Sequence, residues 1–139
     1  MKPKIAQIKK EKPKKVHSLT WWKKRADRAF SRHTRQMYAD SQGQVTCYTC
    51  PRRDHWKNLQ CGHFVPRQYL ATRWDERNCR PQCYACNMLY GGQPSQFAAN
   101  LQREYGPEIV DELNRKRFEV VKLYVVDYQK LIEKYEIPV

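Results

Sequence analysis

Two cysteine pairs constrain the fold of this chain more than any other feature. They are Cys47-Tyr-Thr-Cys50 and Cys83-Tyr-Ala-Cys86, and the second pair runs directly into Asn87. Four thiolates in two C-x-x-C pairs are the usual ligand set of a structural zinc site, which is tetrahedral and closed. We therefore expect Cys47, Cys50, Cys83 and Cys86 to bind one Zn²⁺ and to tie together the segments around them.

The remaining two of the six cysteines are Cys61 and Cys79. The N-terminus is too polar for a secretory signal, so reduced, metal-binding thiols are expected rather than disulfides. Either residue could replace one of the four zinc ligands. Neither belongs to a C-x-x-C pair, and we interpret both as small, buried apolar residues.

Charge indicates the class of partner. The chain of 139 residues has a net charge of +13, and its excess of Lys and Arg lies within residues 1–100, whereas residues 101–139 are nearly neutral. A surface charged in this way favours a polyanion, and nucleic acid is the first candidate. The alternative is a solvated surface with a solubilising tail. The sequence has no apolar run long enough for a membrane span, so we expect no membrane partner.

The length predicts one compact domain with extensions, organised in four parts. Residues 1–17 are rich in Lys and Pro and predict a disordered basic tail. Residues 18–44 predict a basic helix whose apolar stripe packs against the zinc-bearing core. That core spans residues 45–92, and residues 93–139 predict a helical region. Its last helix, over about 118–135, carries an apolar stripe that predicts either core packing or a dimer contact.

Nine basic residues are candidates for DNA contact. They lie on one helix and around the second cysteine pair, where they could neutralise phosphates. On the helix they are Lys23, Lys24, Arg28, Arg32 and Arg35, and in the core they are Arg67, Arg73, Arg77 and Arg80.

Three residues between and after the cysteine pairs could hydrolyse a phosphodiester. His63 is a suitable general base, because a neutral imidazole accepts a proton at physiological pH. Asn78 could fix a loop through its amide, or accept a proton from His63 and so set the tautomer. Asn87 could offer its carbonyl oxygen to a divalent cation such as Mg²⁺. We therefore expect hydrolysis with a catalytic Mg²⁺ or Mn²⁺ and a zinc ion that is only structural.

This layout resembles that of the HNH, or His-Me finger, nucleases. Within that superfamily the chain resembles the NinG (Rap) recombination endonucleases of lambdoid phages over roughly residues 20–115. The resemblance is carried by five motifs: Ala29-Phe30-Ser31, Cys47–Cys50, Gly62-His63-Phe64, Arg73-Trp74-Asp75-Glu76-Arg77-Asn78 and Cys83–Asn87.

The resemblance implies an α+β fold, mostly helical, with a zinc-stabilised ββα-metal (HNH, treble-clef-like) core between N- and C-terminal helices. It implies a structure-selective endonuclease acting on branched recombination intermediates such as Holliday junctions and D-loops. His63 would be its base, Asn78 its positioning residue and Asn87 its metal ligand. A phage- or prophage-encoded protein in the cytoplasm of a bacterial host follows, with a phage recombinase as a partner. Two coordinated cuts favour a homodimer.

One position departs from the wider superfamily. Many members with four zinc-binding cysteines carry Asp directly before the catalytic His, whereas this chain has Gly62. Asp75 or Glu76 could supply the missing carboxylate, and we expect Asp75. The alternatives are a water at that position, or a non-catalytic zinc-finger accessory protein that binds DNA or RNA without cutting it.

Overall fold

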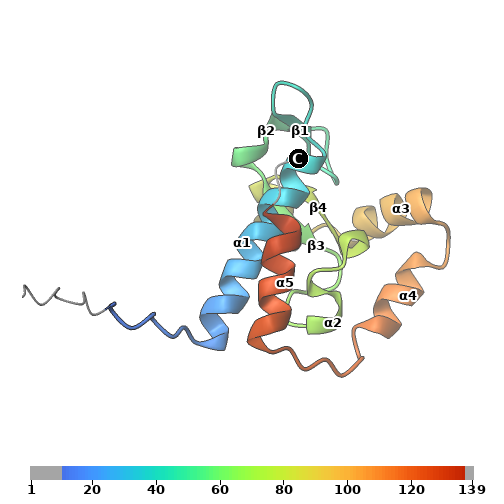
Figure 1. Ribbon diagram of the computed structural model, residues 1–139. Coiled ribbons are helices and arrows are strands. Elements are labelled where there is room, and N and C mark those ends of the chain that lie inside the picture. Colours follow the sequence, from blue (N-terminus) through green and yellow to red (C-terminus); the bar gives the residue numbers. More distant parts are fainter. Residues whose placement is uncertain (1–10, 137–139) are drawn as a thin grey trace, which may run out of the picture.

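The computed structural model describes residues 11–136 and has an α+β fold, which confirms the predicted fold class (Figure 1). Residues 1–10 of the expected tail lie outside the described residues, and residues 11–17 form neither helix nor strand. The helices are α1 (Leu19–Met37), α2 (Leu70–Arg73), α3 (Pro94–Tyr105), α4 (Ile109–Lys116) and α5 (Val125–Tyr135). The strands are β1 (Gln44–Thr46), β2 (Arg53–His55), β3 (Gln60–His63) and β4 (Cys79–Gln82). Short helical turns are η1 (Trp56–Asn58), η2 (Glu76–Asn78) and the π-helical η3 (Ala85–Leu89).

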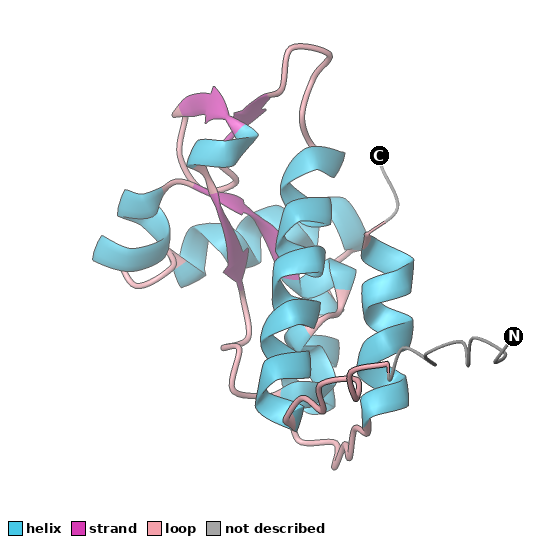
Figure 2. Ribbon diagram, turned by 60° about the vertical axis from the view of Figure 1, so that its left-hand side comes forward, coloured by secondary structure: helices cyan, strands magenta, loops and turns pink. Residues whose placement is uncertain are grey.

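Helices α1 and α5 are far apart in the sequence but pack side by side (Figures 1 and 2). Ser18 caps α1 by accepting a hydrogen bond of 3.2 Å from the Trp21 amide, which satisfies one of the free donors at the helix start. The buried face of α1 includes Phe30, whose ring lies edge-on to Tyr135 of α5 at 4.9 Å. Phe30 and Tyr135 also pack with Cys79 of β4. Helix α1 thus contacts both α5 and the strands β3 and β4.

Helix α5 begins at Val125, seven residues later than the sequence indicates. Asp127 accepts a hydrogen bond of 2.8 Å from the Tyr124 amide, so the true cap lies well inside the apolar stripe. The stripe itself is used within the chain, because Tyr128 and Ile132 are buried against Ala26 of α1. Of the two expectations for this stripe, the structure therefore shows core packing.

Each sheet is a two-stranded antiparallel ribbon. Strands β1 and β2 carry the first cysteine pair in the loop between them, and β3 and β4 form the second ribbon. In that ribbon His63 is directly opposite Cys79, and Gly62 is opposite Arg80. Since side chains alternate between the faces of a strand, His63 and Gly62 face opposite sides.

Helices α3 and α4 cover the far side of this ribbon. Phe97, Leu101, Ile109 and Leu113 form one buried cluster with Val65, which follows β3. The loop after β3 is therefore anchored on one side by this cluster, while its other side faces solvent. None of the helices within residues 11–136 combines the length and the apolar character needed to cross a membrane.

Candidate functional site

The four paired cysteines converge on one point between the ribbons. The sulfur atoms of Cys47, Cys50, Cys83 and Cys86 all lie within 4.8 Å of one another. The Cys50 and Cys83 sulfurs are 3.7 Å apart. Zinc–sulfur bonds of about 2.3 Å in a tetrahedron place sulfurs about 3.8 Å apart, so the spacing fits zinc. The sequence prediction is confirmed to this extent: the four thiols can hold a structural metal such as zinc.

Backbone amides prepare these thiols for a metal. The Cys83 amide donates to the Cys47 sulfur at 3.3 Å, and the Cys86 amide donates to the Cys83 sulfur at 3.5 Å. Burial opposes ionisation of Cys47, but the amides of Cys83 and Thr49 outweigh it and lower the pKa of this thiol to about 7. Metal ligation requires the thiolate, so this environment favours Cys47 as a ligand, whereas burial raises the pKa of Cys50 to about 12 and also raises the pKa of Cys86.

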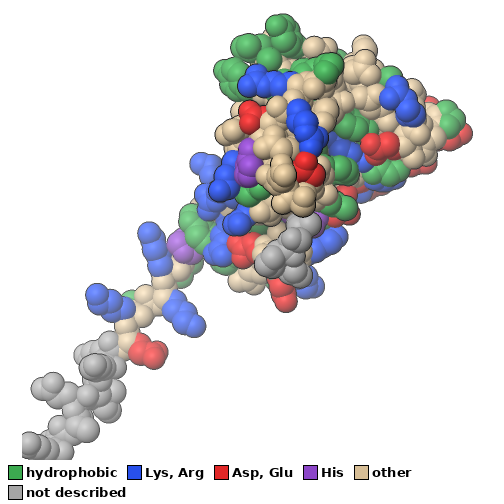
Figure 3. Space-filling view, turned by 90° about the horizontal axis from the view of Figure 1, so that it is seen from above, with side chains coloured by type: hydrophobic (Ala, Val, Ile, Leu, Met, Phe, Trp, Pro, Cys, Tyr) green, Lys and Arg blue, Asp and Glu red, His purple; other side chains and the backbone are tan. Residues whose placement is uncertain are grey.

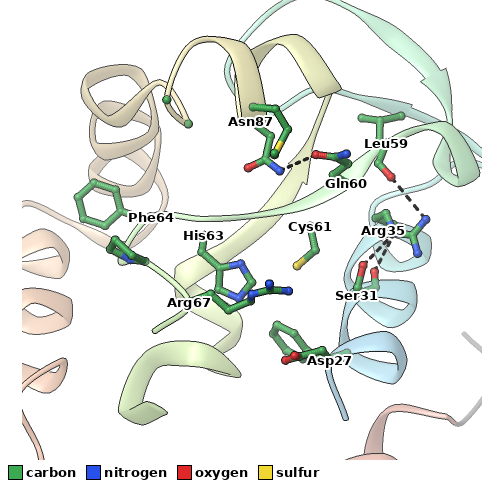
Figure 4. A pocket seen from close by; sticks show the side chains of 15 residues that line it. Asp27, Ser31, Arg35, Leu59, Gln60, Cys61, His63, Phe64, Arg67 and Asn87 are labelled. Carbon is green, nitrogen blue, oxygen red and sulfur yellow. Dashed lines mark hydrogen bonds between the residues drawn. The ribbon is translucent and has the colours of Figure 1, made fainter. Parts of the chain in front are cut away.

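An open cavity of about 680 Å³ lies between α1, β3 and η3 (Figure 4). His63 and Asn87 both line it, so the structure brings together the predicted base and the predicted metal ligand. Arg35 and Arg67 also line it, and they make the cavity attractive to an anion. The cavity is also lined by one carboxylate, that of Asp27 on α1.

The His63 ring is held in one tautomer. Its Nε2 lies 2.9 Å from the carbonyl oxygen of Arg73. A carbonyl can only accept, so Nε2 carries the proton and Nδ1 keeps its lone pair. Burial lowers the pKa of His63 below its ordinary value and Arg67 lowers it further, while hydrogen bonds with the backbone of Arg73 and Cys61 offset this only in part. The imidazole is therefore neutral and able to accept a proton at neutral pH.

Asp27 is a site residue that sequence reasoning missed. Its carboxylate accepts hydrogen bonds from Nε of Arg73 at 2.9 Å and from the indole of Trp74 at 3.1 Å. The ion pair fixes Arg73, whose carbonyl in turn holds His63. Asp27 thus positions His63 through Arg73. The sequence shows Asp27 as the one acidic residue of a basic helix. Its role near His63 becomes visible only when α1 packs against the ribbon.

Asn78 fixes the loop after β3. It is fully buried, and its amide oxygen accepts from the Val65 amide at 2.7 Å. Its amide nitrogen donates to the carbonyls of Val65 at 3.0 Å and Thr72 at 3.1 Å. Of the two roles considered for Asn78, the geometry is that of loop fixing, because the His63 tautomer is set by the Arg73 carbonyl instead.

Asn87 presents an oxygen to the cavity. Its amide nitrogen donates to Oε1 of Gln60 at 2.7 Å. Within residues 11–136 no group donates to its amide oxygen, which leaves that atom for a cation or water. Amide and carboxylate oxygens are hard ligands of the kind that Mg²⁺ and Mn²⁺ accept, and Mg²⁺ keeps several waters of its own. Asn87 therefore offers one oxygen of this kind to the cavity, whereas both oxygens of the Asp27 carboxylate already accept hydrogen bonds from Arg73.

Asp75 does not reach this cavity, contrary to the expectation that it completes the metal shell. Its carboxylate accepts from Lys116 at 2.7 Å and from Arg77 at 3.0 Å, and it caps η2. Burial raises its pKa, but these bonds outweigh burial and lower the pKa to about 2. Two cations compensate its charge, so Asp75 stabilises the turn before β4.

The packing around Gly62 explains why this position carries glycine. A Cβ atom at this position would lie 1.9 Å from Oε1 of Gln82. Gln82 is fully buried and is held by Thr49 at 2.9 Å and by the Gly92 carbonyl at 3.0 Å. No carboxylate can replace Gly62 without displacing Gln82, so residue 62 contributes no metal ligand.

The nine basic candidates differ in whether a carboxylate pairs with them. Arg80 is 1% exposed and bonds Glu104 at 2.6 Å, so it cannot touch DNA, and the expectation for it is wrong. Arg73 and Arg77 are tied to Asp27 and to Asp75, so their charges are largely compensated. The candidates without a carboxylate partner within residues 11–136 are those of α1 and the loop after β3: Lys23, Lys24, Arg28, Arg32, Arg35 and Arg67.

Comparisons with known proteins give one match. A family model described as bacteriophage lambda NinG protein matches residues 2–139. No curated protein and no solved structure matches the chain. The matched range includes the four paired cysteines, the cavity and every helix from α1 to α5. The match therefore concerns the whole arrangement described above.

Proposed function

The chain belongs to the bacteriophage lambda NinG family, and from this premise we propose that it is a metal-dependent endonuclease that cuts branched DNA during phage recombination. The observation that carries the proposal is His63. Its Nε2 is anchored to a backbone carbonyl while the ring lines a cationic cavity beside Asn87. We propose further that the ribbon β3–β4 with η3 is an HNH-type ββα-metal core, and that the protein acts in the cytoplasm of the bacterial host.

In this mechanism His63 is the general base. Its free Nδ1 accepts a proton from water, and the resulting hydroxide attacks phosphorus. Arg35 and Arg67 bind the phosphate and offset its charge. A divalent cation such as Mg²⁺ or Mn²⁺, held by the Asn87 oxygen and by its own waters, would supply stabilisation for the departing 3′ oxygen. Asp27 and Asn78 keep the ring and the loop in place.

Helix α1 supports DNA binding along the rim of the cavity. Lys24, Arg28 and Arg32 are exposed and recur at intervals of four, so they follow one face of the helix. Asp27 and Ser31 of the neighbouring face line the cavity itself. A DNA backbone that runs along α1 would therefore pass the catalytic base.

An exposed apolar tip supports a preference for branched DNA. The tip consists of Tyr84, Met88, Leu89 and Tyr90, which are 54–64% exposed. Met88 also lines the cavity. Hydrophobic side chains gather at the upper edge of the face in Figure 3, with Lys and Arg side chains below them. Aromatic and apolar side chains stack on unpaired bases or wedge between them, and such bases occur at branch points.

The proposal is tested by cleavage of an end-labelled four-way junction and a linear duplex of the same sequence, with Mg²⁺ or Mn²⁺. We expect junction-selective cutting, and we expect Tyr90→Ser to reduce that selectivity. Two coordinated cuts favour a second copy of the chain as a partner, and a phage recombinase is the partner that the family suggests. Equal cutting of both substrates would refute the branch preference but not the nuclease.

A second prediction concerns the rim. Arg28→Ala should weaken binding to all DNA sequences alike and should reduce the slope of log K against log salt by about 0.9, because one phosphate contact is lost. Binding is measured by fluorescence anisotropy over a range of salt concentrations. The matched control is Arg103→Ala, an exposed arginine on α3. An equal loss in both variants would mean that α1 has no special role.

A non-catalytic zinc-stabilised DNA- or RNA-binding protein is the second candidate. One observation favours it: the cavity carboxylate, Asp27, is engaged by Arg73, Asp75 lies outside the cavity, and Gln82 occupies the space beside Gly62. Binding of the junction without cutting under either metal would establish this alternative.

A further inference from the structure

We infer that Cys61, His63 and Cys79 form a second metal site, which takes a soft ion such as Zn²⁺ and removes His63 from catalysis when it is filled. The site itself stands on the geometry of the ribbon. Its inhibitory effect rests on the proposed nuclease function. The sequence alone indicates only small buried residues at positions 61 and 79.

The ribbon places the three side chains on one face. His63 lies directly opposite Cys79, and Cys61 is two residues before His63 on the same strand. Alternation along a strand therefore points Cys61 and His63 to the same side. One ligand atom from each of the three residues lies within 4.8 Å of the others. This is the only such group besides the four paired cysteines within residues 11–136.

Two thiolates and one imidazole are a zinc ligand set that leaves the fourth position open for water. The second nitrogen of a zinc-bound histidine usually donates to a carbonyl or carboxylate. His63 already makes that bond through Nε2 to the Arg73 carbonyl at 2.9 Å, which leaves Nδ1 as the ligand atom. The ring is thus oriented for a metal as well as for a proton.

The surroundings of the site allow an ion to enter. Cys61 lines the open cavity, whereas Cys79 is only 1% exposed. An ion can therefore arrive from the cavity side and be held from beneath by Cys79.

Occupation of this site competes directly with catalysis. Zinc would bind the same Nδ1 lone pair that accepts the proton of water. Zinc would then have opposite effects at two places. At the four paired cysteines it would stabilise the fold, and at the second site it would inhibit catalysis. A hard cation at Asn87 does not compete, because Mg²⁺ prefers oxygen ligands to thiolates.

The site is tested by Co²⁺ titration of the reduced, metal-free full chain, followed by absorption. Thiolate-to-cobalt charge transfer reports each site, and the ligand-field bands distinguish four sulfurs from two sulfurs and a nitrogen. We expect two equivalents for the native chain and one for Cys79→Ser and for Cys61→Ser, with the four-sulfur spectrum retained in both. One equivalent for the native chain, with a spectrum unchanged in both variants, would overturn the inference. So would a Cys61–Cys79 disulfide that forms in place of metal binding.

The inhibitory effect is tested separately, with each protein compared with its own zinc-free cleavage rate in Mg²⁺. Excess Zn²⁺ should reduce native cleavage by about 10²-fold or more, as expected for loss of the base, and should have little effect on Cys79→Ser. Two cobalt equivalents without DNA cleavage would keep the site and refute the nuclease. Cleavage with one equivalent would keep the nuclease and refute the site. Equal zinc sensitivity of both proteins would refute the link between the two.

Discussion

Replacement of His63 by alanine is expected to reduce junction cleavage by about 10²–10⁴-fold, the usual contribution of a general base. DNA binding should be retained, because the imidazole is neutral and the rim of α1 is untouched. The measurement combines single-turnover cleavage with an anisotropy binding assay. The matched control is His55→Ala, since His55 caps η1 and does not line the cavity. Cleavage that survives in His63→Ala would rule out this residue as the base.

The pH dependence provides an independent check on His63. The base works only when it is neutral, and burial lowers its pKa below the ordinary value of about 6.5. The native rate should therefore rise with pH below that value and be level by neutral pH. A rate that still rose steeply above pH 7 would point to another base.

Removal of the structural metal is expected to have the largest effect on stability. Structural zinc contributes an apparent binding free energy of about 10–16 kcal/mol at neutral pH, and this energy is coupled to folding. A domain is stable by only about 5–15 kcal/mol, so Cys83→Ala, or a strong chelator, should unfold the region around the cysteines. Thermal unfolding by circular dichroism and limited proteolysis both report this loss.

The matched control for that experiment is Cys61→Ala, which also removes one thiol from the chain. Cys61 is not one of the four paired ligands, so with one equivalent of zinc, which fills only those four cysteines, this variant should keep a cooperative transition close to that of the native chain. Loss of the fold in both variants would show that the thiols contribute through packing rather than through a shared metal. Full stability in the chelator would contradict the structural role of zinc.

The features that could be predicted from the sequence depend on short-range spacing. A C-x-x-C pair places two thiols within reach of one ion by local geometry, and the same holds for Asn87 directly after Cys86. His63 and Asn87 lie 24 positions apart in the sequence. Both line the same cavity, because the four paired cysteines hold η3, which carries Asn87, near the strands. The expected α+β fold class came from the family resemblance, whereas helical periodicity indicated where the helices lie.

The features that were missed depend on contacts between distant segments. Asp27 became a site residue only because α1 packs against the ribbon, and no local pattern encodes that contact. Arg80 was expected on the surface, but α3 supplies Glu104 and Tyr105 to receive its guanidinium in the interior. The predicted start of α5 was wrong because Asp127 caps the helix inside an apolar stripe.

The packing of α1 on α5 has a consequence for how the protein is made. Helix α1 leaves the ribosome first, but its partner α5 is completed only at Tyr135, about a hundred residues later. At 5–20 residues per second this delay is roughly 5–20 s, during which Asp27 has no fixed helix to hold it against the ribbon. The zinc-bound ribbon can form within that time, because its ligands are close in sequence. Synthesis therefore orders assembly, and the packing of α1 beside the cavity is completed only after α5 has been made.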